Sequence, residues 1–258
     1  KRKEFSGVLR LPFEYDTNTG LLQDSQIVAG VDAEDWRVAP SVAIQWVPAR
    51  GPVEAGGRFA AFHSLHFEQD EVDFANLLAA PFLGYLPPSE EFRVEFSPFG
   101  AFSWVSGEEY ERNLGAAATV DWFFDLAWMA RFSYQLTNRD VQFESLSPEL
   151  DRDGLVHLGS LRFEYRPPGS PFWAGFGGTF EVQNTKGADF DRNAGSLLGE
   201  IGYRFTEQLY GVVGYTLLFE NYENPNSLST AGAKREDTRH SALTRLSWRL
   251  NSWLELYV

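Results

Sequence analysis

The chain has 258 residues, a formal net charge of −14 and no cysteine. Its length allows one large domain or two small ones, and the lack of cysteine excludes disulfide frameworks, thiolate metal sites and cysteine nucleophiles. The acidic balance argues against a nucleic-acid partner, because phosphate binding needs a basic stripe that the sequence lacks.

Apolar and polar residues alternate with a period of two through most of the chain, which is typical of strands. The alternation predicts strands over residues 5–15, 36–46, 53–68, 74–86, 92–104, 113–123, 126–137, 161–166, 172–183, 196–205, 209–220, 239–250 and 253–258. These are about 13 strands, many of them longer than soluble strands usually are. Residues 74–86 are apolar on both faces, so the pattern does not show which of their side chains point outward.

The links between these strands alternate in length. Short links fall at residues 48–52, 87–91, 123–125, 167–171, 206–208 and 251–252, and mostly longer ones at 16–35, 68–72, 105–110, 138–154, 184–193 and 223–238. Short turns at one end and longer loops at the other are typical of outer-membrane barrels. Aromatic residues flank both ends, as in the two interfacial belts of such barrels.

The sequence therefore predicts an all-β fold, a transmembrane antiparallel up-and-down β-barrel formed as a single domain by residues 1–258. Bacterial barrels have even strand counts, so we expect about 14 strands, with the missing one beyond Val258 or among unassigned residues. The alternative is a soluble β-sandwich, which also has one apolar face per strand. The excess of 18 Arg over 4 Lys favours the barrel, because Arg forms multidentate pairs in enclosed polar spaces.

The whole chain resembles bacterial outer-membrane β-barrels, porin-like ones among them, in this pattern of strands and links. A local resemblance lies in Phe13-Glu14-Tyr15-Asp16-Thr17-Asn18 and in Pro40-Ser41-Val42-Ala43-Ile44-Gln45-Trp46. These segments look like the opening strands of barrels that follow periplasmic tetratricopeptide repeats, such as the surface lipoprotein assembly modifiers. That resemblance implies a 14-stranded barrel that helps move lipoproteins to the cell surface, and it assigns no functional residue here.

A charged ladder on the inward phase of the strands is the main candidate site. Its members are Arg10, Glu14, Arg37, Glu54, Arg58, Arg93, Glu95, Asp121, Arg131, Arg162, Glu164, Glu181, Glu200, Arg204, Glu220, Arg245 and Arg249. One interpretation is a set of charges that determines the selectivity of a water-filled pore. The other is a mesh of structural ion pairs that fills a narrow lumen, and the sequence does not decide between them.

A weak calcium candidate is formed by Asp189, Asp191 and Asn193, with Glu200 at the twelfth position, as in a calcium-binding loop. Ala194 stands where the sharp turn requires Gly, and Glu200 falls inside a predicted strand, so the alternative is a solvated acidic loop. The histidines show no shared metal spacing, and we expect neither a resident metal nor a cofactor. Acidic loop residues, among them Asp32, Glu34, Asp70 and Glu71, are candidates for divalent ions that bridge lipopolysaccharide.

The predicted function is a bacterial outer-membrane pore for passive passage of small polar solutes or ions. The alternative is a barrel that anchors a multi-protein export or surface-assembly complex and has no open pore. An outer-membrane hydrolase is a third possibility, but no local Ser–His signature supports it, so we expect no enzyme. The expected partners are the lipid bilayer, lipopolysaccharide and periplasmic or outer-membrane proteins.

Overall fold

The computed structural model describes residues 4–16, 21–22, 26–27, 35–49, 51–68, 72–143, 145, 147–225, 227, 232–251 and 254–257. Their strands are β1 (Phe5–Arg10), β2 (Phe13–Asp16), β3 (Leu21–Leu22), β4 (Gln26–Ile27), β5 (Asp35–Val38), β6 (Ser41–Ala49), β7 (Val53–His66), β8 (Phe74–Tyr85), β9 (Phe92–Val105), β10 (Glu108–Phe123), β11 (Trp128–Val141), β12 (Gly154–Tyr165), β13 (Phe172–Thr185), β14 (Arg192–Arg204), β15 (Leu209–Pro225), β16 (Lys234–Arg249) and β17 (Glu255–Tyr257). Two single turns of 3-10 helix, η2 (Pro148–Leu150) and η3 (Ala188–Phe190), lie between strands. Within these ranges, no helix is long and apolar enough to span a membrane.

The predicted up-and-down architecture is confirmed by the order of the strands. A single 15-stranded sheet has the order β1-β6-β7-β8-β9-β10-β11-β12-β13-β14-β15-β16-β17, with β2 and β5 beside this path, and β3 and β4 form a separate pair. Thirteen strands therefore lie on the path, and from β6 onward each is followed by the next strand in the chain. A sandwich would need two packed sheets of comparable size, so this order contradicts the soluble alternative.

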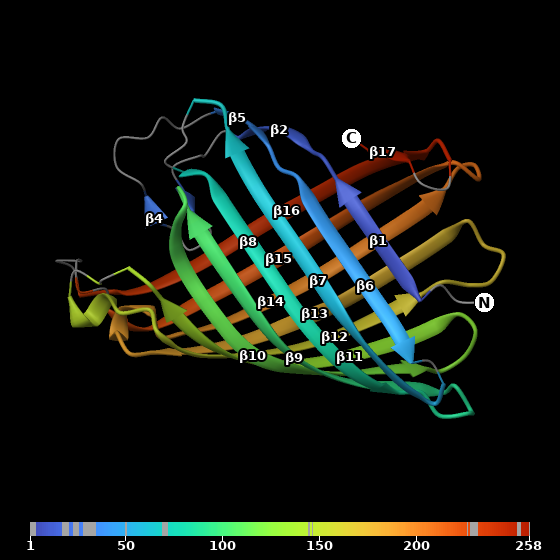
Figure 1. The fold of residues 1–258 in the computed structure, drawn as a ribbon, viewed down its shortest axis with the longest axis horizontal. Helices are drawn as coiled ribbons and strands as arrows, with labels where there is room; N and C mark the ends of the chain where they lie inside the picture. Colours follow the sequence, from blue (N-terminus) through green and yellow to red (C-terminus); the bar gives the residue numbers. More distant parts are fainter. Residues whose placement is uncertain are drawn as a thin grey trace. The chain divides into compact units, whose positions relative to one another are not determined.

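The chain divides into two compact units whose boundary passes through strands β9, β10 and β11. The first unit comprises Lys1–Gly84, Phe96–Ala116 and Thr137–Glu144, and the second comprises Tyr85–Glu95, Ala117–Leu136 and Ser145–Val258. In the second unit, β12 to β16 follow one another as neighbouring antiparallel strands (Figure 1).

Proline interrupts the first two predicted strands. Residues 5–15 divide into β1 and β2 around Pro12, and residues 36–46 divide into β5 and β6 around Pro40. Proline has no N–H group to donate to a ladder, but its carbonyl still accepts. The Pro12 carbonyl accepts from the Ala39 N–H at 3.1 Å, and the Pro40 carbonyl accepts from the His63 N–H at 2.9 Å. The two interruptions therefore lie next to each other and remain hydrogen-bonded.

Several predicted loops are shorter in the structure, because the strands extend into them. The link predicted at residues 105–110 is a two-residue turn, in which Ser106 has φ 50° and Gly107 has φ 83°. Two successive positive φ values match the hairpin turn whose twist suits adjoining strands. Strands β13, β14, β15 and β16 continue through polar residues beyond the part in which apolar residues alternate. The links between them are therefore residues 186–191 and 226–233, shorter than the predicted 184–193 and 223–238.

The short turns are held by polar side chains that cap nearby backbone N–H groups. The Asp125 carboxylate accepts from the Ala127 N–H at 2.6 Å and from the Trp128 N–H at 2.9 Å. The Thr206 hydroxyl accepts from the Leu209 N–H at 2.9 Å. Such local bonds are the reason that Asp, Asn, Ser and Thr favour turns.

The structure assigns the two faces of β8, which the sequence left open. Phe82 is buried and Leu83 is exposed, so even-numbered residues of this strand face the same side as the polar residues of β7. The Arg58 guanidinium carbon lies 4.5 Å from the centre of the Phe82 ring. Gly56 makes this arrangement possible, because a Cβ at residue 56 would lie 2.8 Å from the ring.

Candidate functional site: the polar face of the second unit

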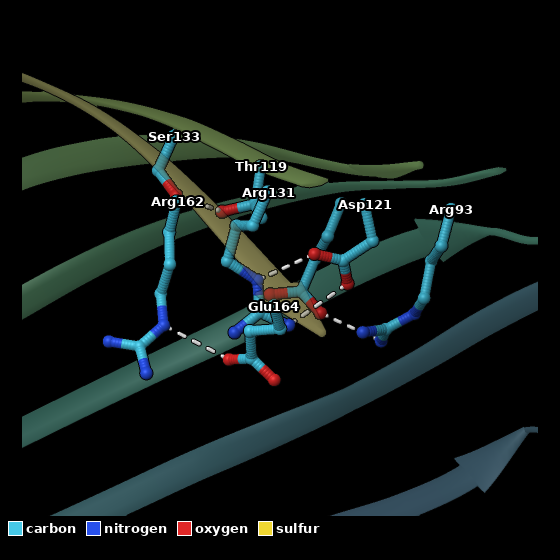
Figure 2. Close-up of polar contacts among 8 residues, drawn as sticks. Arg93, Thr119, Asp121, Arg131, Ser133, Arg162 and Glu164 are labelled. Atoms are coloured by element: carbon cyan, nitrogen blue, oxygen red, sulfur yellow. Dashed lines mark hydrogen bonds and ion pairs between the residues drawn. The ribbon is translucent and has the colours of Figure 1, made fainter. Parts of the chain in front are cut away.

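The ladder registers of β12 to β16 sort their side chains onto two faces. Glu164 lies opposite Gly175, Gly175 opposite Glu200, and Glu200 opposite Gly214, so these residues share one face. Since successive side chains alternate, that face carries the even-numbered residues of β12, β14 and β15 and the odd-numbered residues of β13 and β16. We call it the polar face and the opposite one the apolar face, and the charged side chains of β9 to β11 that lie beside Arg162 and Glu164 in Figure 2 belong to the polar face.

Burial on the two faces is the reverse of that in a water-soluble protein. Asp121 and Glu220 keep only 4% and 3% of their surface exposed, whereas Phe180, Leu197 and Val213 keep 59%, 60% and 61%. A soluble domain rarely exposes so many large apolar side chains while it buries carboxylates. Lipid around the apolar face removes this contradiction, because acyl chains accept apolar side chains and cannot solvate charges.

Close to the short turns, the polar face of β9 to β12 carries ion pairs between neighbouring positions (Figure 2). The Arg131 guanidinium donates to both Asp121 carboxylate oxygens, at 2.6 and 3.1 Å, which is the two-pronged geometry of strong Arg–carboxylate pairs. Arg93 donates to Glu95 at 2.8 Å. The hydroxyls of Thr119 and Ser133 lie 3.5 Å apart beside them.

A glycine allows the next pair to bridge three strands. Arg162 of β12 donates to Glu164 at 3.0 Å and also contacts Glu200, which lies on β14. The intervening β13 carries Gly175 at this position, and a Cβ there would lie 3.1 Å from the Arg162 Nη2 atom and 3.2 Å from the Glu200 Oε1 atom. The absence of a side chain on Gly175 therefore gives the pair the room that it occupies.

A second charged network lies toward the longer loops. Arg192 donates to Glu181 at 3.0 Å and to Glu220 at 2.5 Å, and Arg239 donates to the other oxygen of Glu220 at 2.5 Å. Glu220 is thus buried between two guanidinium groups, which offset the cost of removing its charge from water. Thr179 and Ser196, with hydroxyls 2.7 Å apart, occupy the same face in the middle of β13 and β14.

The first unit has its own charged contacts. Arg37 donates to Glu14 at 2.9 Å across β2 and β5, and the Arg139 guanidinium lies 3.5 Å from Glu111. Glu54 is buried on β7.

The structure thus brings many predicted ladder residues into ion pairs but leaves others separate. Arg249 lies 3.7 Å from Glu255, and Arg10, Arg204 and Arg245 are exposed and form no ion pair within the described part of the chain.

Four members of these networks were not predicted. Arg192, Arg239, Glu111 and Arg139 lie near strand ends that the sequence assigned to loops or left out of the ladder. The available signal was an even spacing from residues already in the predicted ladder. Arg192 lies eight residues before Glu200, and Arg139 lies eight residues after Arg131. Equal parity places residues of one continuous strand on one face.

Each of the three calcium candidate residues hydrogen-bonds a residue elsewhere in the chain, either in a link or near the end of a strand. The Asp189 carboxylate accepts from the Ser227 hydroxyl at 2.6 Å, and the Asp191 carboxylate accepts from the Thr185 N–H at 2.6 Å. Asn193 donates its side-chain amide to Glu223 at 2.9 Å. No group of three or more acidic or His residues within the described ranges is arranged to hold a metal. Asp32, Glu34, Asp70 and Glu71 lie outside those ranges.

The strand order and the reversed burial together define a wall of a transmembrane β-barrel. No protein-family model and no curated protein match the sequence. Among solved structures, the chain is similar to a NanC porin in a rhombohedral crystal form, at 10% sequence identity and with a TM-score of 0.49. That similarity covers 94% of this chain and 100% of the porin chain.

Proposed function

We propose that this protein is a bacterial outer-membrane pore through which small polar solutes or ions pass passively. The observation that carries the proposal is the pairing of a charged, hydrogen-bonded face with an apolar exposed face on the same strands. The apolar face contacts lipid acyl chains, and the loops contact lipopolysaccharide. The polar face then lines an aqueous path, because its carboxylates and guanidinium groups need water or one another.

Single-channel recording from the purified, detergent-folded protein in a planar bilayer tests this function. We expect steady openings whose ion preference shifts toward cations in Arg131→Gln, because this change leaves the Asp121 charge without its partner. The matched control is Arg112→Gln, which removes the same charge. Arg112 lies on β10 two residues before the exposed Leu114, so both side chains point to the same outward side of the strand. The control should keep the wild-type ion preference.

A correctly folded protein that never conducts would contradict the pore. Co-purification of other proteins in fixed stoichiometry would then favour a barrel that anchors an export or assembly complex. An unchanged ion preference in Arg131→Gln, in a protein that does conduct, would place the conducting path away from the Arg131–Asp121 pair.

A further inference from the structure

Four arginines of the second unit lie on the polar face near the short turns and have few acidic partners. We call Arg166, Arg204, Arg245 and Arg249 the basic patch. The ion pair that this patch makes within the described residues joins Arg249 to Glu255, at 3.7 Å. Elsewhere on the polar face of the same unit, each of five arginines has a carboxylate at 3.0 Å or less, namely Arg93, Arg131, Arg162, Arg192 and Arg239. The patch therefore differs from the rest of the face in its net positive charge.

The ladder registers place the patch around the start of β15. Arg204 lies opposite Tyr210, and Arg245 lies opposite Val212, on the two strands that flank β15. Two strand spacings across β15, with an offset of two residues along it, put the two arginine backbones about 12 Å apart. Both side chains are exposed, so neither guanidinium is occupied by packing.

Aromatic groups border the patch. The Trp173 indole lies over Gly202, where a Cβ would come within 2.0 Å of the ring, and the Arg166 guanidinium carbon lies 5.5 Å from the centre of a Trp173 ring. The Tyr210 hydroxyl donates to Glu255, so this carboxylate already has two partners. The Arg166 guanidinium thus lies against Trp173, and Glu255 is shared between Tyr210 and Arg249.

From these positions we infer that the basic patch is a binding site for a small oxyanion, a dicarboxylate or a phosphate. Guanidinium groups stay protonated at any physiological pH, so the patch cannot lower its repulsion by losing protons. An anion with several oxygens relieves that repulsion and accepts paired N–H bonds from more than one arginine. This inference rests on the proposed pore function and makes it more specific, since it names anions as the solutes. Binding itself does not require conduction.

Isothermal titration calorimetry on the detergent-folded full chain tests the site, with succinate and inorganic phosphate as separate probes. We expect saturable binding of at least one probe, weakened at least about tenfold in the double variant Arg204→Gln/Arg245→Gln, because each charged hydrogen bond contributes a similar factor. The probe that binds distinguishes a carboxylate site from a phosphate site. Arg112→Gln is the matched control, since it removes the same charge from a position on β10 that faces the same side as the exposed Leu114, and it should bind as the wild type does.

Equal affinity in the double variant and the wild type would overturn the site, as would no saturable binding of either probe. Far-ultraviolet circular dichroism of each variant confirms that it is folded, and both exposed arginines should tolerate substitution. Conductance of the same preparations separates the two proposals. Binding without conduction would leave the site and overturn the pore, whereas conduction without binding would do the reverse.

Discussion

At the scale of single residues, the polar face depends on positions that have no side chain. Gly175 lies between Arg162 and Glu200, and a Cβ on it would be in tight contact with both charged groups, at 3.1 and 3.2 Å. A residue that looks neutral in the sequence therefore affects how closely two charges can meet across the strand that lies between them. Single-sequence patterns cannot show this, because the contact depends on the registers of two ladders.

Gly175→Val should destabilise the protein by about 1–3 kcal/mol, because a branched side chain overpacks the space between the paired groups. The measurement is the urea midpoint of unfolding in detergent or lipid. Gly199→Val is the matched control on the neighbouring strand, where a Cβ would meet no atom within 4 Å. Equal stability of the two variants would show that the Arg162–Glu200 contact is not confined by Gly175.

At the scale of elements, two of the longer loops pack against each other through their backbones. The Gly187 N–H donates to the Asp151 carbonyl at 2.9 Å, and a Cβ on Gly187 would lie 2.4 Å from the Asp151 nitrogen. The Lys186 ammonium also lies 2.9 Å from Asp153. The links that contain η2 and η3 therefore form one ordered contact instead of two independent loops.

Gly187→Ala should separate these two loops, because the atoms it would meet belong to the backbone and cannot rotate away. Trypsin should then cleave after Arg152 and Lys186 faster than in the wild type, since exposed and mobile links are its preferred sites. Gly57→Ala provides the comparison, because a Cβ on Gly57 meets nothing within 4 Å. Wild-type cleavage rates in Gly187→Ala would mean that the loops tolerate the added methyl group.

Some properties of the strands follow from the sequence alone and others do not. Alternation located the strands and their faces, because burial of one face requires a period of two. It failed for the orientation of β8, where residues such as Phe82 and Leu83 are apolar on both faces. It also made strands too short where polar residues continue the ladder, as at Arg192 and at residues 234–238, because apolar content and strand pairing are separate properties.

At the scale of the whole molecule, neighbouring residues should differ strongly in how much the same change destabilises the protein. Leu197 lies on the apolar face of β14 and Leu198 on the polar face. Leu197→Arg should destabilise the membrane-inserted protein by about 2–4 kcal/mol if it lies near the bilayer midplane, because acyl chains cannot solvate the guanidinium. Leu198→Arg should cost much less, and unfolding titrations in liposomes measure both. Equal losses would contradict lipid contact on the apolar face.

The hairpin of β9 and β10 also bears on the order of folding. Its turn contains only Ser106 and Gly107, and the strands that it joins are neighbours in the sheet. A short closure costs little chain entropy, and isolated hairpins form within about 1–10 μs. We therefore expect this turn to close early in folding, with pairing then spreading to both sides by local steps. The contact order stays low for most of the sheet, in contrast to β-folds whose neighbours are distant in the chain.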